Sequence, residues 1–335
     1  MTETHLTPVA EPSAPAPVIE VRDLVKSYRV RGGHRLAVRA LDGVSLAVGR
    51  RSTYGLVGES GCGKTTLGRV LLRLERPDSG RITFDGQDWL AERGERLRVA
   101  RKDIQAIFQD PLGSLDPRRT AGYAIGEALR AHGLASSKHG REQRAAELLG
   151  QVGLAPDVAG RHPGELSGGQ RQRVTIARAI ALRPKFVVCD EATSALDVSV
   201  QAQIINLLID LQESLGVSYL FISHSLAAVR HVADRVGVMY LGRIVEEAAA
   251  SRIFTAPQHP YTSALLAAAP VPDPAAARRD LRARHLGGEV PSATSLPSGC
   301  RFRLRCPRAE TICAAQEPPL AEFADGHAVA CHFPG

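Results

Sequence analysis

The chain has 335 residues, and its 42 Lys and Arg residues against 35 Asp and Glu residues give a formal net charge of +7. Its composition, 44% apolar and 23% charged, is that of an ordinary globular protein and excludes a disordered chain, a collagen-like chain and a coiled-coil rod. The length allows about two domains of usual size. No uncharged apolar run reaches the roughly 18–20 residues that span a bilayer, and the N-terminus lacks a secretory signal. We therefore expect a cytosolic protein, and the mild charge does not indicate a nucleic-acid partner.

In chain order, the prolines within residues 1–17 predict a disordered N-terminal tail. Short apolar or alternating runs then predict strands at 18–21, 44–48, 54–57, 80–86 and 104–108, with a helix at 64–74. Helical signals dominate residues 110–183. Strands are predicted again at 186–189 and 219–222, separated by a helix at 200–215, and a strand pair follows at 236–240 and 243–247. This alternation predicts an α/β fold with a mainly parallel sheet and an inserted helical subdomain at about 110–183.

The predicted strand at 54–57 and the following helix are joined by the string Gly58-Glu59-Ser60-Gly61-Cys62-Gly63-Lys64-Thr65, followed by Thr66. It fits the pattern G-x-x-x-x-G-K-[ST], whose glycines let backbone N–H groups surround phosphate oxygens at a helix N-terminus. We expect Lys64 to reach the β- and γ-phosphates, Thr65 to place its hydroxyl on Mg²⁺, and Thr66 to lie in the same nucleotide site. The alternative is a glycine-rich turn with no ligand.

Two acidic residues, Asp190 and Glu191, follow the apolar run Phe186-Val187-Val188-Cys189. A carboxylate at the end of a buried strand beside a phosphate loop is suited to hold Mg²⁺, usually through water, so we assign Asp190 to the metal. The next carboxylate, Glu191, is placed to orient and polarise an attacking water. Alone, the run indicates only a strand that meets solvent. With the phosphate loop it predicts a nucleoside triphosphatase.

The string Leu166-Ser167-Gly168-Gly169-Gln170 opens a predicted helix and offers a second set of donors for phosphate. If the chain's own loop is already filled, these donors serve a nucleotide held by a partner chain. A plain capped helix start is the alternative. In this order, the strings within residues 18–256 resemble the ATP-binding subunits of ABC transporters.

The resemblance implies roles for further residues. Tyr28 takes the place of an aromatic residue that stacks on adenine, and Gln109 that of a glutamine that senses Mg²⁺ and water and links to membrane subunits. Ser194-Ala195-Leu196-Asp197 matches a segment that contacts the partner subunit. His224 matches a histidine that contacts the γ-phosphate and positions Glu191.

Two strings resemble the dipeptide, oligopeptide and nickel branch of ABC importers. The first is Gln109-Asp110-Pro111-Leu112-Gly113-Ser114-Leu115-Asp116-Pro117-Arg118, and the second is His259-Pro260-Tyr261-Thr262 with Leu265-Leu266. Asp116 replaces the branch's usual Asn, and Thr65 replaces its commoner Ser. The resemblance implies an ATP-binding domain at 18–256 and a C-terminal extension at 257–335. It also implies a pair of ATPase subunits, identical or paralogous, peripheral on the cytoplasmic face of the membrane. These would dock on two membrane-spanning permease subunits and import peptides delivered by an extracytoplasmic binding protein, with dipeptides, oligopeptides and nickel chelates all open as cargo.

Four of the six cysteines crowd the last 36 residues: Cys300, Cys306, Cys313 and Cys331. Their spacing is wider than that of C-x2-C zinc sites. It resembles the extension of peptide-importer ATPases, where four cysteines are linked to an iron–sulfur cluster. A [4Fe–4S] cluster is the favoured interpretation; a [2Fe–2S] cluster, zinc and unligated thiols are the alternatives. We expect the nearby His327 and His332 to be surface residues.

Other classes of nucleoside triphosphatase fit less well. An ABC ATPase of DNA repair or chromosome structure inserts a long coiled coil before the second glycine string, and residues 64–166 carry no sustained heptads. A translation-type ABC factor has two nucleotide cassettes, whereas this chain has one phosphate loop. A P-loop kinase does not need Ser167-Gly168-Gly169-Gln170. We therefore favour a transporter ATPase.

Overall fold

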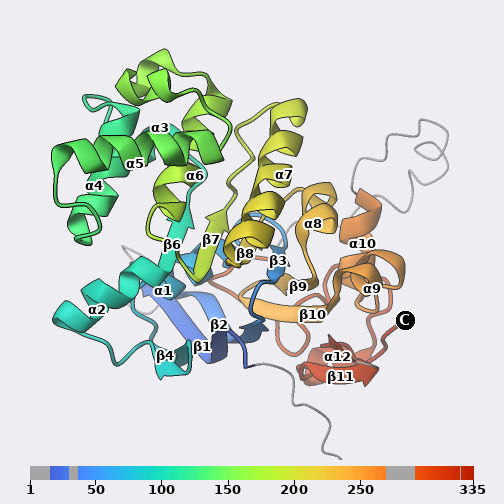
Figure 1. Cartoon of the computed structure of the whole chain (residues 1–335). Helices are drawn as coiled ribbons and strands as arrows, with labels where there is room; N and C mark the ends of the chain where they lie inside the picture. The colour runs from blue at the N-terminus through green and yellow to red at the C-terminus, as the bar shows by residue number, and fades with distance from the viewer. Residues whose placement is uncertain (1–15, 30–36, 269–290, 325) are drawn as a thin grey trace, which may run out of the picture.

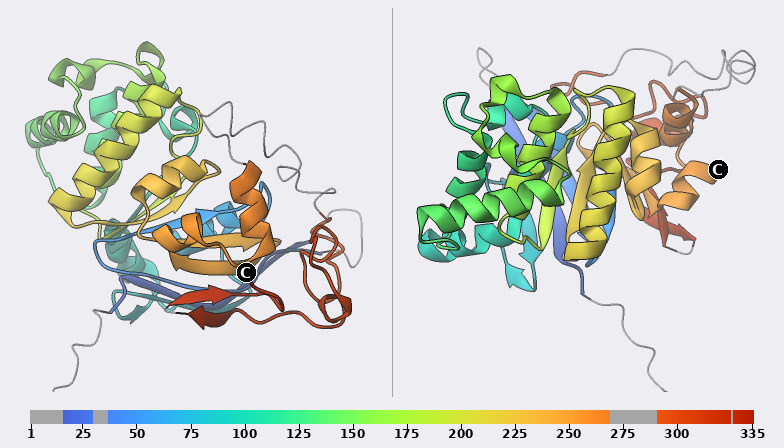
Figure 2. Two further views of the ribbon diagram at one scale, coloured as in Figure 1. Left: turned by 90° about the vertical axis from the view of Figure 1, so that its right-hand side faces the viewer. Right: turned by 45° about the horizontal axis from the view of Figure 1, so that its top comes forward.

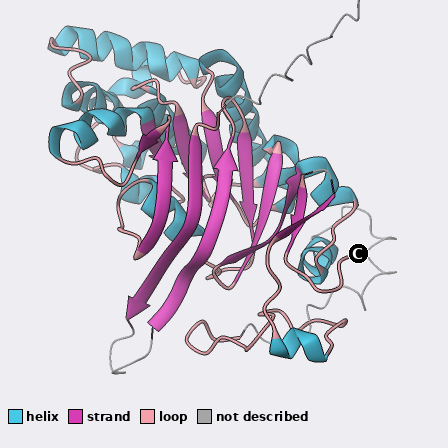
Figure 3. Ribbon diagram, turned by 90° about the horizontal axis from the view of Figure 1, so that it is seen from below, coloured by secondary structure: helices cyan, strands magenta, loops and turns pink. Residues whose placement is uncertain are grey.

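The structure is a computed structural model that describes residues 16–29, 37–268, 291–324 and 326–335. The larger part of the predicted N-terminal tail, residues 1–15, lies outside the described residues. Among the described residues, two β-sheets form the centre of the molecule and helices cover the larger sheet (Figures 1 and 3).

The larger sheet has eight described strands in the order β11-β12-β10-β9-β3-β8-β7-β6. The five neighbouring strands β9, β3, β8, β7 and β6 are parallel, and β10, β12 and β11 continue the sheet in antiparallel fashion. The strands are β3 Thr53–Val57, β6 Ile104–Ile107, β7 Phe186–Asp190, β8 Ser218–Ile222, β9 Arg235–Tyr240, β10 Arg243–Ala249, β11 Ala321–Ala324 and β12 His327–Val329. Every residue of β3, β7 and β8 is buried, as expected for parallel strands covered on both faces. The predicted parallel core is confirmed.

A second, four-stranded antiparallel sheet has the order β2-β1-β4-β5. Its strands are β1 Ile19–Arg29, β2 Ala37–Val48, β4 Ser79–Phe84 and β5 Gln87–Asp88. The sequence predicted only short parts of β1 and β2, because register shifts between Val21 and Leu24 and again farther along interrupt the alternation that identifies a strand. An apolar layer that includes Ile19, Leu41 and Trp89 packs this sheet and α1 onto one face of the larger sheet.

The helices follow the predicted order, with α1 ending earlier than expected. They are α1 Lys64–Leu71, α2 Gly94–Ala100, α3 Pro111–Ser114, α4 Ala121–Ala131, α5 Lys138–Gln151, α6 Gly168–Ile180, α7 Val198–Leu215, α8 Leu226–Val232, α9 Ala250–Thr255, α10 Pro260–Ala268 and α12 Thr311–Ala315. Helices α3 to α6 lie in the chain between the neighbouring parallel strands β6 and β7, and they form the green group at the top of Figure 1. Buried Ile125, Leu148 and Ile176 hold this group together and belong to the same apolar core as α7.

The C-terminal region contributes strands to the larger sheet. Strand β12 pairs with β10 and thereby extends the larger sheet, and β11 pairs with β12 (Figure 2, left). Cys300, Phe302 and Cys313 belong to the same buried core as the central strands. The Cys-rich extension is therefore not shown as a distinct feature of the fold, because main-chain pairing and a shared core join it to the rest of the chain. No helix in the described ranges is long and apolar enough to cross a membrane.

Candidate nucleotide site

The glycine string lies between β3 and α1, as the sequence predicted. Gly58, Gly61 and Gly63 have φ values of +153°, +78° and +114°. A Cβ on Gly58 would lie 2.2 Å from the Met239 carbonyl oxygen, and one on Gly63 would lie 2.1 Å from the Ala40 carbonyl oxygen. Gly58 and Gly63 are therefore required both by their backbone conformation and by close packing. The loop is held in one tight shape before the helix N-terminus.

Lys64 is the first residue of α1 and is 4% exposed. Its Nζ donates hydrogen bonds to the carbonyl oxygens of Gly58 at 2.8 Å and Glu59 at 3.0 Å, and it lies 3.7 Å from the Cys62 sulfur. The Lys64 side chain therefore folds back so that its ammonium group lies inside the loop. Ser60, Gly61 and Thr65 on the same loop are exposed.

Thr65 and Asp190 meet across the sheet edge. The Thr65 hydroxyl donates to Oδ1 of Asp190 at 3.2 Å, although the two residues are 125 positions apart. Burial raises the pKa of Asp190; the Thr65 hydrogen bond lowers this pKa and the charge of Glu191 raises it further. A buried carboxylate whose charge is poorly compensated, beside a hydroxyl, forms the oxygen donor set that Mg²⁺ prefers. The described residues at this edge therefore fit the predicted magnesium site.

Glu191, His224 and Gln109 follow three neighbouring parallel strands. Ile107 pairs with Cys189 and Asp190 pairs with Ile222, so each of the three side chains lies one or two residues beyond a paired position at the same sheet edge. Nδ1 of His224 lies 3.5 Å from Oε2 of Glu191. The Glu191 backbone has a φ of +49° and donates to the Ile222 carbonyl oxygen at 3.0 Å. Gln109 is exposed, and β6 ends two residues before it.

The second glycine string starts α6. Ser167 is its N-cap: its Oγ accepts from the Gln170 N–H at 3.3 Å, and Oε1 of Gln170 accepts from the Ser167 N–H at 2.9 Å. This reciprocal capping leaves Ser167 exposed at a helix N-terminus. A Cβ on Gly169 would lie 2.7 Å from Cγ1 of Val200, so the string packs against the start of α7. Between residues 166–170 and 58–66, all of them described, no hydrogen bond is present.

Tyr28, the predicted adenine-stacking residue, lies near the end of β1. Its hydroxyl donates to Oε2 of Glu75 at 2.5 Å, and the ring lies 5.4 Å from Nζ of Lys26. Burial and the hydrogen bond to Glu75 raise the pKa of Tyr28, while a side-chain contact with Thr66 lowers it. The contact with Thr66 places Tyr28 beside the start of α1 and thus beside the phosphate loop.

Two family descriptions match the chain. Residues 41–194 match the family described as "ABC transporter", and residues 245–313 match "Oligopeptide/dipeptide transporter, C-terminal region". The probable peptide ABC transporter ATP-binding protein y4tS of Sinorhizobium fredii is 51% identical over 319 residues, which cover 94% of this chain and 89% of that protein. This chain belongs to the ATP-binding proteins of the oligopeptide and dipeptide ABC transporter family. It is therefore an ABC transporter ATPase.

Other relatives give the same assignment. The oligopeptide transport ATP-binding protein AppF of Bacillus subtilis is 47% identical over 321 residues, with 94% of this chain and 97% of that protein covered. Among solved structures, a dimeric post-hydrolysis form of the ATP-binding cassette MJ0796 bound to ADP and Pi matches with a TM-score of 0.62 and 28% identity. That match covers 69% of this chain and 98% of the cassette. Part of this chain therefore has no counterpart in the MJ0796 cassette.

The four C-terminal cysteines come together without forming a metal site. Cys300, Cys306, Cys313 and Cys331 line one cavity of about 10 Å³, which has room for one water molecule at most. Burial raises the pKa of Cys300 to about 11 and also raises the pKa values of Cys306 and Cys331. Within the described ranges, no group of three or more His, Cys, Asp or Glu residues is arranged to hold a metal ion. The donor chemistry suits a cluster, but the side chains are not disposed around a metal position.

One expectation about histidines is wrong. His327 is only 5% exposed, and its Nε2 lies 2.7 Å from Oε1 of Glu246 in β10. It is a buried partner of a fully buried carboxylate rather than a surface residue, because β12 carries it into the sheet. His332 is the more exposed of the two, and its Nε2 lies 3.1 Å from the Gln316 carbonyl oxygen.

The structure also brings two C-terminal side chains to the phosphate loop that sequence reasoning did not place there. The Arg305 guanidinium bonds both carboxylate oxygens of Glu59, and the Tyr261 hydroxyl accepts the Glu59 N–H. Tyr261 was noticed only as part of the string His259-Pro260-Tyr261-Thr262. No local pattern singles out Arg305, since the contact joins positions 246 residues apart.

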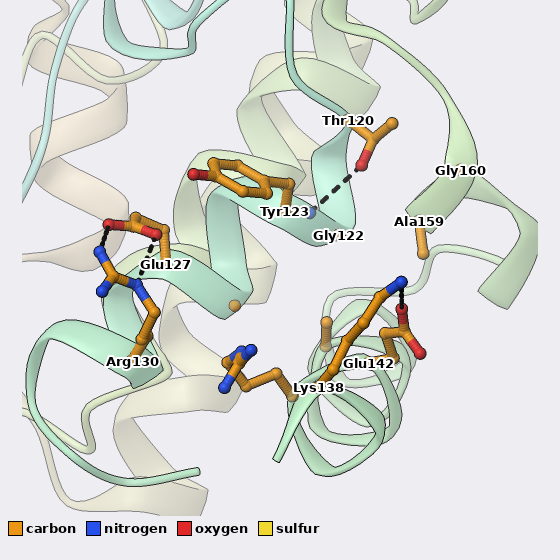
Figure 4. A pocket seen from close by; sticks show the side chains of 12 residues that line it. Thr120, Gly122, Tyr123, Glu127, Arg130, Lys138, Glu142, Ala159 and Gly160 are labelled. Carbon is orange, nitrogen blue, oxygen red and sulfur yellow. Dashed lines mark hydrogen bonds and ion pairs between the residues drawn. The ribbon is translucent and has the colours of Figure 1, made fainter. Parts of the chain in front are cut away.

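A larger hollow lies in the helical group. A cavity of about 680 Å³ opens between α4, α5 and the 3₁₀ helix Pro156–Gly160. Figure 4 shows Tyr123 and the ion pairs Glu127–Arg130 and Lys138–Glu142 around it. The lining of this cavity includes no residue of the phosphate loop and none of Gln109, Glu191 and His224. It is therefore distinct from the candidate nucleotide site.

Proposed function

We propose that this chain binds and hydrolyses ATP with Mg²⁺ at the carboxyl edge of the larger sheet and thereby powers the import of peptides. The observation that carries the proposal is the convergence of Thr65 with Asp190, and of Glu191 with His224, beside a phosphate loop of the required shape. These residues come from three separate parts of the sequence. Their meeting at one edge supplies the groups that phosphoryl transfer to water needs.

Each residue has a role that follows from its position. Residues 58–66 surround the phosphates with backbone N–H groups, and Lys64 exchanges its carbonyl partners for phosphate oxygens. Thr65, Asp190 and Gln109 hold Mg²⁺, which neutralises charge on the phosphates when it is bound. Glu191 accepts a hydrogen bond from the attacking water and orients it, and His224 positions Glu191. Tyr28 stacks on the adenine ring.

The active form is proposed to be a pair of ATPase subunits, a second copy or a paralogue. Gly168 and Gly169 present helix-terminal N–H groups that the capping pair Ser167–Gln170 does not use, and residues 166–170 make no hydrogen bond to the chain's own loop. This supports the use of the Ser167–Gln170 string on a nucleotide held by the partner. Residues 194–197 would contact the same partner. The solved dimeric structure of the MJ0796 cassette supports this arrangement.

The cargo is proposed to be peptide. Support comes from the match of residues 245–313 to an oligopeptide/dipeptide transporter region and from relatives named for peptide and oligopeptide transport. The pair would be peripheral on the cytoplasmic face of the membrane and would dock on two permease subunits through the surface near residues 109–118. An extracytoplasmic binding protein would deliver the cargo.

The test is transport by the complete complex. The chain is co-expressed with the permease subunits and binding protein of its transporter, and the complex is placed in proteoliposomes. The binding protein is supplied at the membrane face opposite the ATPase subunits. We expect ATP-dependent accumulation of a labelled tetrapeptide inside these vesicles. A Lys64→Ala complex is the matched control and should not accumulate peptide. ATP-dependent uptake of a nickel chelate with no uptake of any peptide would contradict the peptide assignment.

We further propose that residues 18–256 act as the ATP-binding domain and 257–335 as an extension whose four cysteines hold an iron–sulfur cluster, with zinc as the alternative. What supports the cluster is that thiols from Cys300, Cys306, Cys313 and Cys331 line one cavity and form a donor set that suits iron. The thiols would have to move apart and lose their protons to bind it. Iron, sulfide and zinc are measured after anaerobic purification. Zinc in a one-to-one ratio without sulfide would refute the cluster.

A further inference from the structure

The C-terminal region reaches the phosphate loop at Glu59. The Arg305 guanidinium donates from NH1 to Oε2 of Glu59 at 2.8 Å and from NH2 to Oε1 at 2.9 Å. The Glu59 N–H donates to the Tyr261 hydroxyl at 2.9 Å. The Arg305 side chain is 3% exposed and Tyr261 is fully buried, so water competes little for these bonds. Both the side chain and the main chain of Glu59 are thus held from outside the loop.

Arg305 and Tyr261 are themselves fixed by an aromatic cluster of Tyr240, Tyr261 and Phe302. The Tyr261 ring centroid lies 4.6 Å from that of Tyr240 and 5.4 Å from that of Phe302. The Arg305 guanidinium lies 5.9 Å from the centroids of both Tyr240 and Phe302, and it donates to the Tyr240 hydroxyl at 3.4 Å. Such stacking limits the rotamers of a long side chain before any ligand arrives. The guanidinium is therefore presented to Glu59 in a fixed position.

The charge of Glu59 gives the contact a consequence for nucleotide binding. Glu59 is the only acidic residue between Gly58 and Thr66, the segment that must receive a triphosphate of high negative charge. An uncompensated carboxylate there would repel the phosphates at short range. The bidentate bond with Arg305 compensates that charge and points the carboxylate at the C-terminal region.

We propose that Arg305 and Tyr261 are positioning residues of the ATP site, through which the C-terminal region sets the phosphate loop and neutralises its carboxylate. The inference rests on the proposed function only in that the loop binds ATP. It adds that residues beyond 256 are needed for full ATP affinity, although they touch neither the reacting groups nor Mg²⁺. The strongest effect is expected on binding rather than on the hydrolytic step.

The test measures ATP affinity of the full-length chain by equilibrium dialysis, together with KM and kcat for hydrolysis by the assembled complex. Arg305→Met should weaken ATP binding about tenfold, equivalent to about 1.4 kcal/mol, and raise KM by a similar factor, with kcat within about twofold because Glu191 and His224 are untouched. Tyr261→Phe should give a smaller loss in the same direction. Arg303→Met is the matched control: Arg303 bonds Ser298 of its own segment, and ATP affinity should not change.

A rescue separates charge compensation from general damage to the fold. In the Glu59→Gln/Arg305→Met double variant no carboxylate remains to repel the phosphates, so most of the lost affinity should return. Arg305→Lys should retain part of the affinity. Wild-type affinity in Arg305→Met, or a double variant as weak as Arg305→Met, would overturn the inference while leaving the proposed function intact. Absence of ATP binding by the wild-type chain would instead refute the proposed function, and this inference with it.

Discussion

The buried carboxylate of Glu246 offers a direct measure of how firmly the C-terminal region is joined to the sheet. Glu246 is 0% exposed and lies in β10. Its Oε1 accepts from the Gln258 N–H at 2.6 Å and lies 2.7 Å from Nε2 of His327, and its Oε2 accepts from the His259 N–H at 3.0 Å. One side chain thus connects β10 to the start of α10 and to β12.

Glu246→Gln changes the charge and one acceptor while the shape is kept. The amide oxygen of the new glutamine is best placed toward the Gln258 N–H and Nε2 of His327, because in the opposite orientation the amide NH₂ would face these two hydrogen-bond donors. The amide NH₂ then faces the His259 N–H, so one charge-assisted bond worth about 1.5–3 kcal/mol is lost and a buried donor is left unsatisfied. The two remaining bonds become neutral and weaker by about half. We expect a total loss of about 3 kcal/mol in the free energy of unfolding.

Urea denaturation followed by circular dichroism of the full-length chain measures this loss. Glu322→Gln is the matched control: Glu322 lies on exposed β11 and accepts one backbone N–H, from Gly326, at 2.9 Å. That substitution should cost less than about 0.5 kcal/mol, as surface changes usually do. A Glu246→Gln variant within 1 kcal/mol of the wild type would contradict this reasoning, since the three bonds could not then be holding the region to the sheet.

Three further predictions concern the loop, the buried ion pair and the metal. Gly63→Ala should lower ATP affinity at least about tenfold, because its Cβ would lie 2.1 Å from the Ala40 carbonyl oxygen, whereas Gly61→Ala, with no atom within 4 Å, should lose much less in the same binding assay. The ion pair joins Arg301 to Asp42. Burial raises the pKa of Asp42, but the hydrogen bond and charge of Arg301, with the charges of other nearby arginines, outweigh burial and lower this pKa overall. The stabilisation from the pair is therefore present above the unfolded pKa of about 3.9 and is lost as the pH falls through the folded pKa. Arg301→Met should therefore cost about 3–5 kcal/mol at pH 7 in urea denaturation and much less at pH 3, and an equal cost at both pH values would contradict this. Asp190→Asn should raise the Mg²⁺ concentration for half-maximal hydrolysis at least about tenfold in a Mg²⁺ titration, while an unchanged midpoint would remove Asp190 from the metal.

Local signals in the sequence predicted much of the fold and of the geometry at the candidate ATP site. The strand, glycine loop and helix at 53–71 and the acidic end of β7 lie where the patterns placed them. Such elements are readable because their constraints are local: positive φ values demand glycines, and strands covered on both faces demand continuous apolar runs. Asp190 and Glu191 were predicted from the acidic end of one strand, and the resemblance to ABC transporter subunits implied that His224 acts beside them. Parallel strands bring their carboxyl ends to one edge, which is why these residues lie together.

The features that the sequence did not predict depend on contacts between distant segments. Strand β1 was recognised only at its start because register shifts break its alternation. His327 was expected on the surface, since nothing near it in sequence shows that β12 pairs with β10 and carries it to Glu246. The contact of Arg305 with Glu59 is likewise invisible locally, because its meaning depends on how the C-terminal region folds back onto the loop.

The central claim, that the edge formed by the phosphate loop, Asp190 and Glu191 hydrolyses ATP, is tested most directly with Glu191→Gln. The variant keeps the size of the side chain and its place near His224 but removes the carboxylate that orients water. ATP binding and the rate of phosphate release are measured on the same preparation of the assembled complex. We predict ATP affinity within about threefold of the wild type and phosphate release lower by at least about 100-fold. Phosphate release at the wild-type rate would contradict the account.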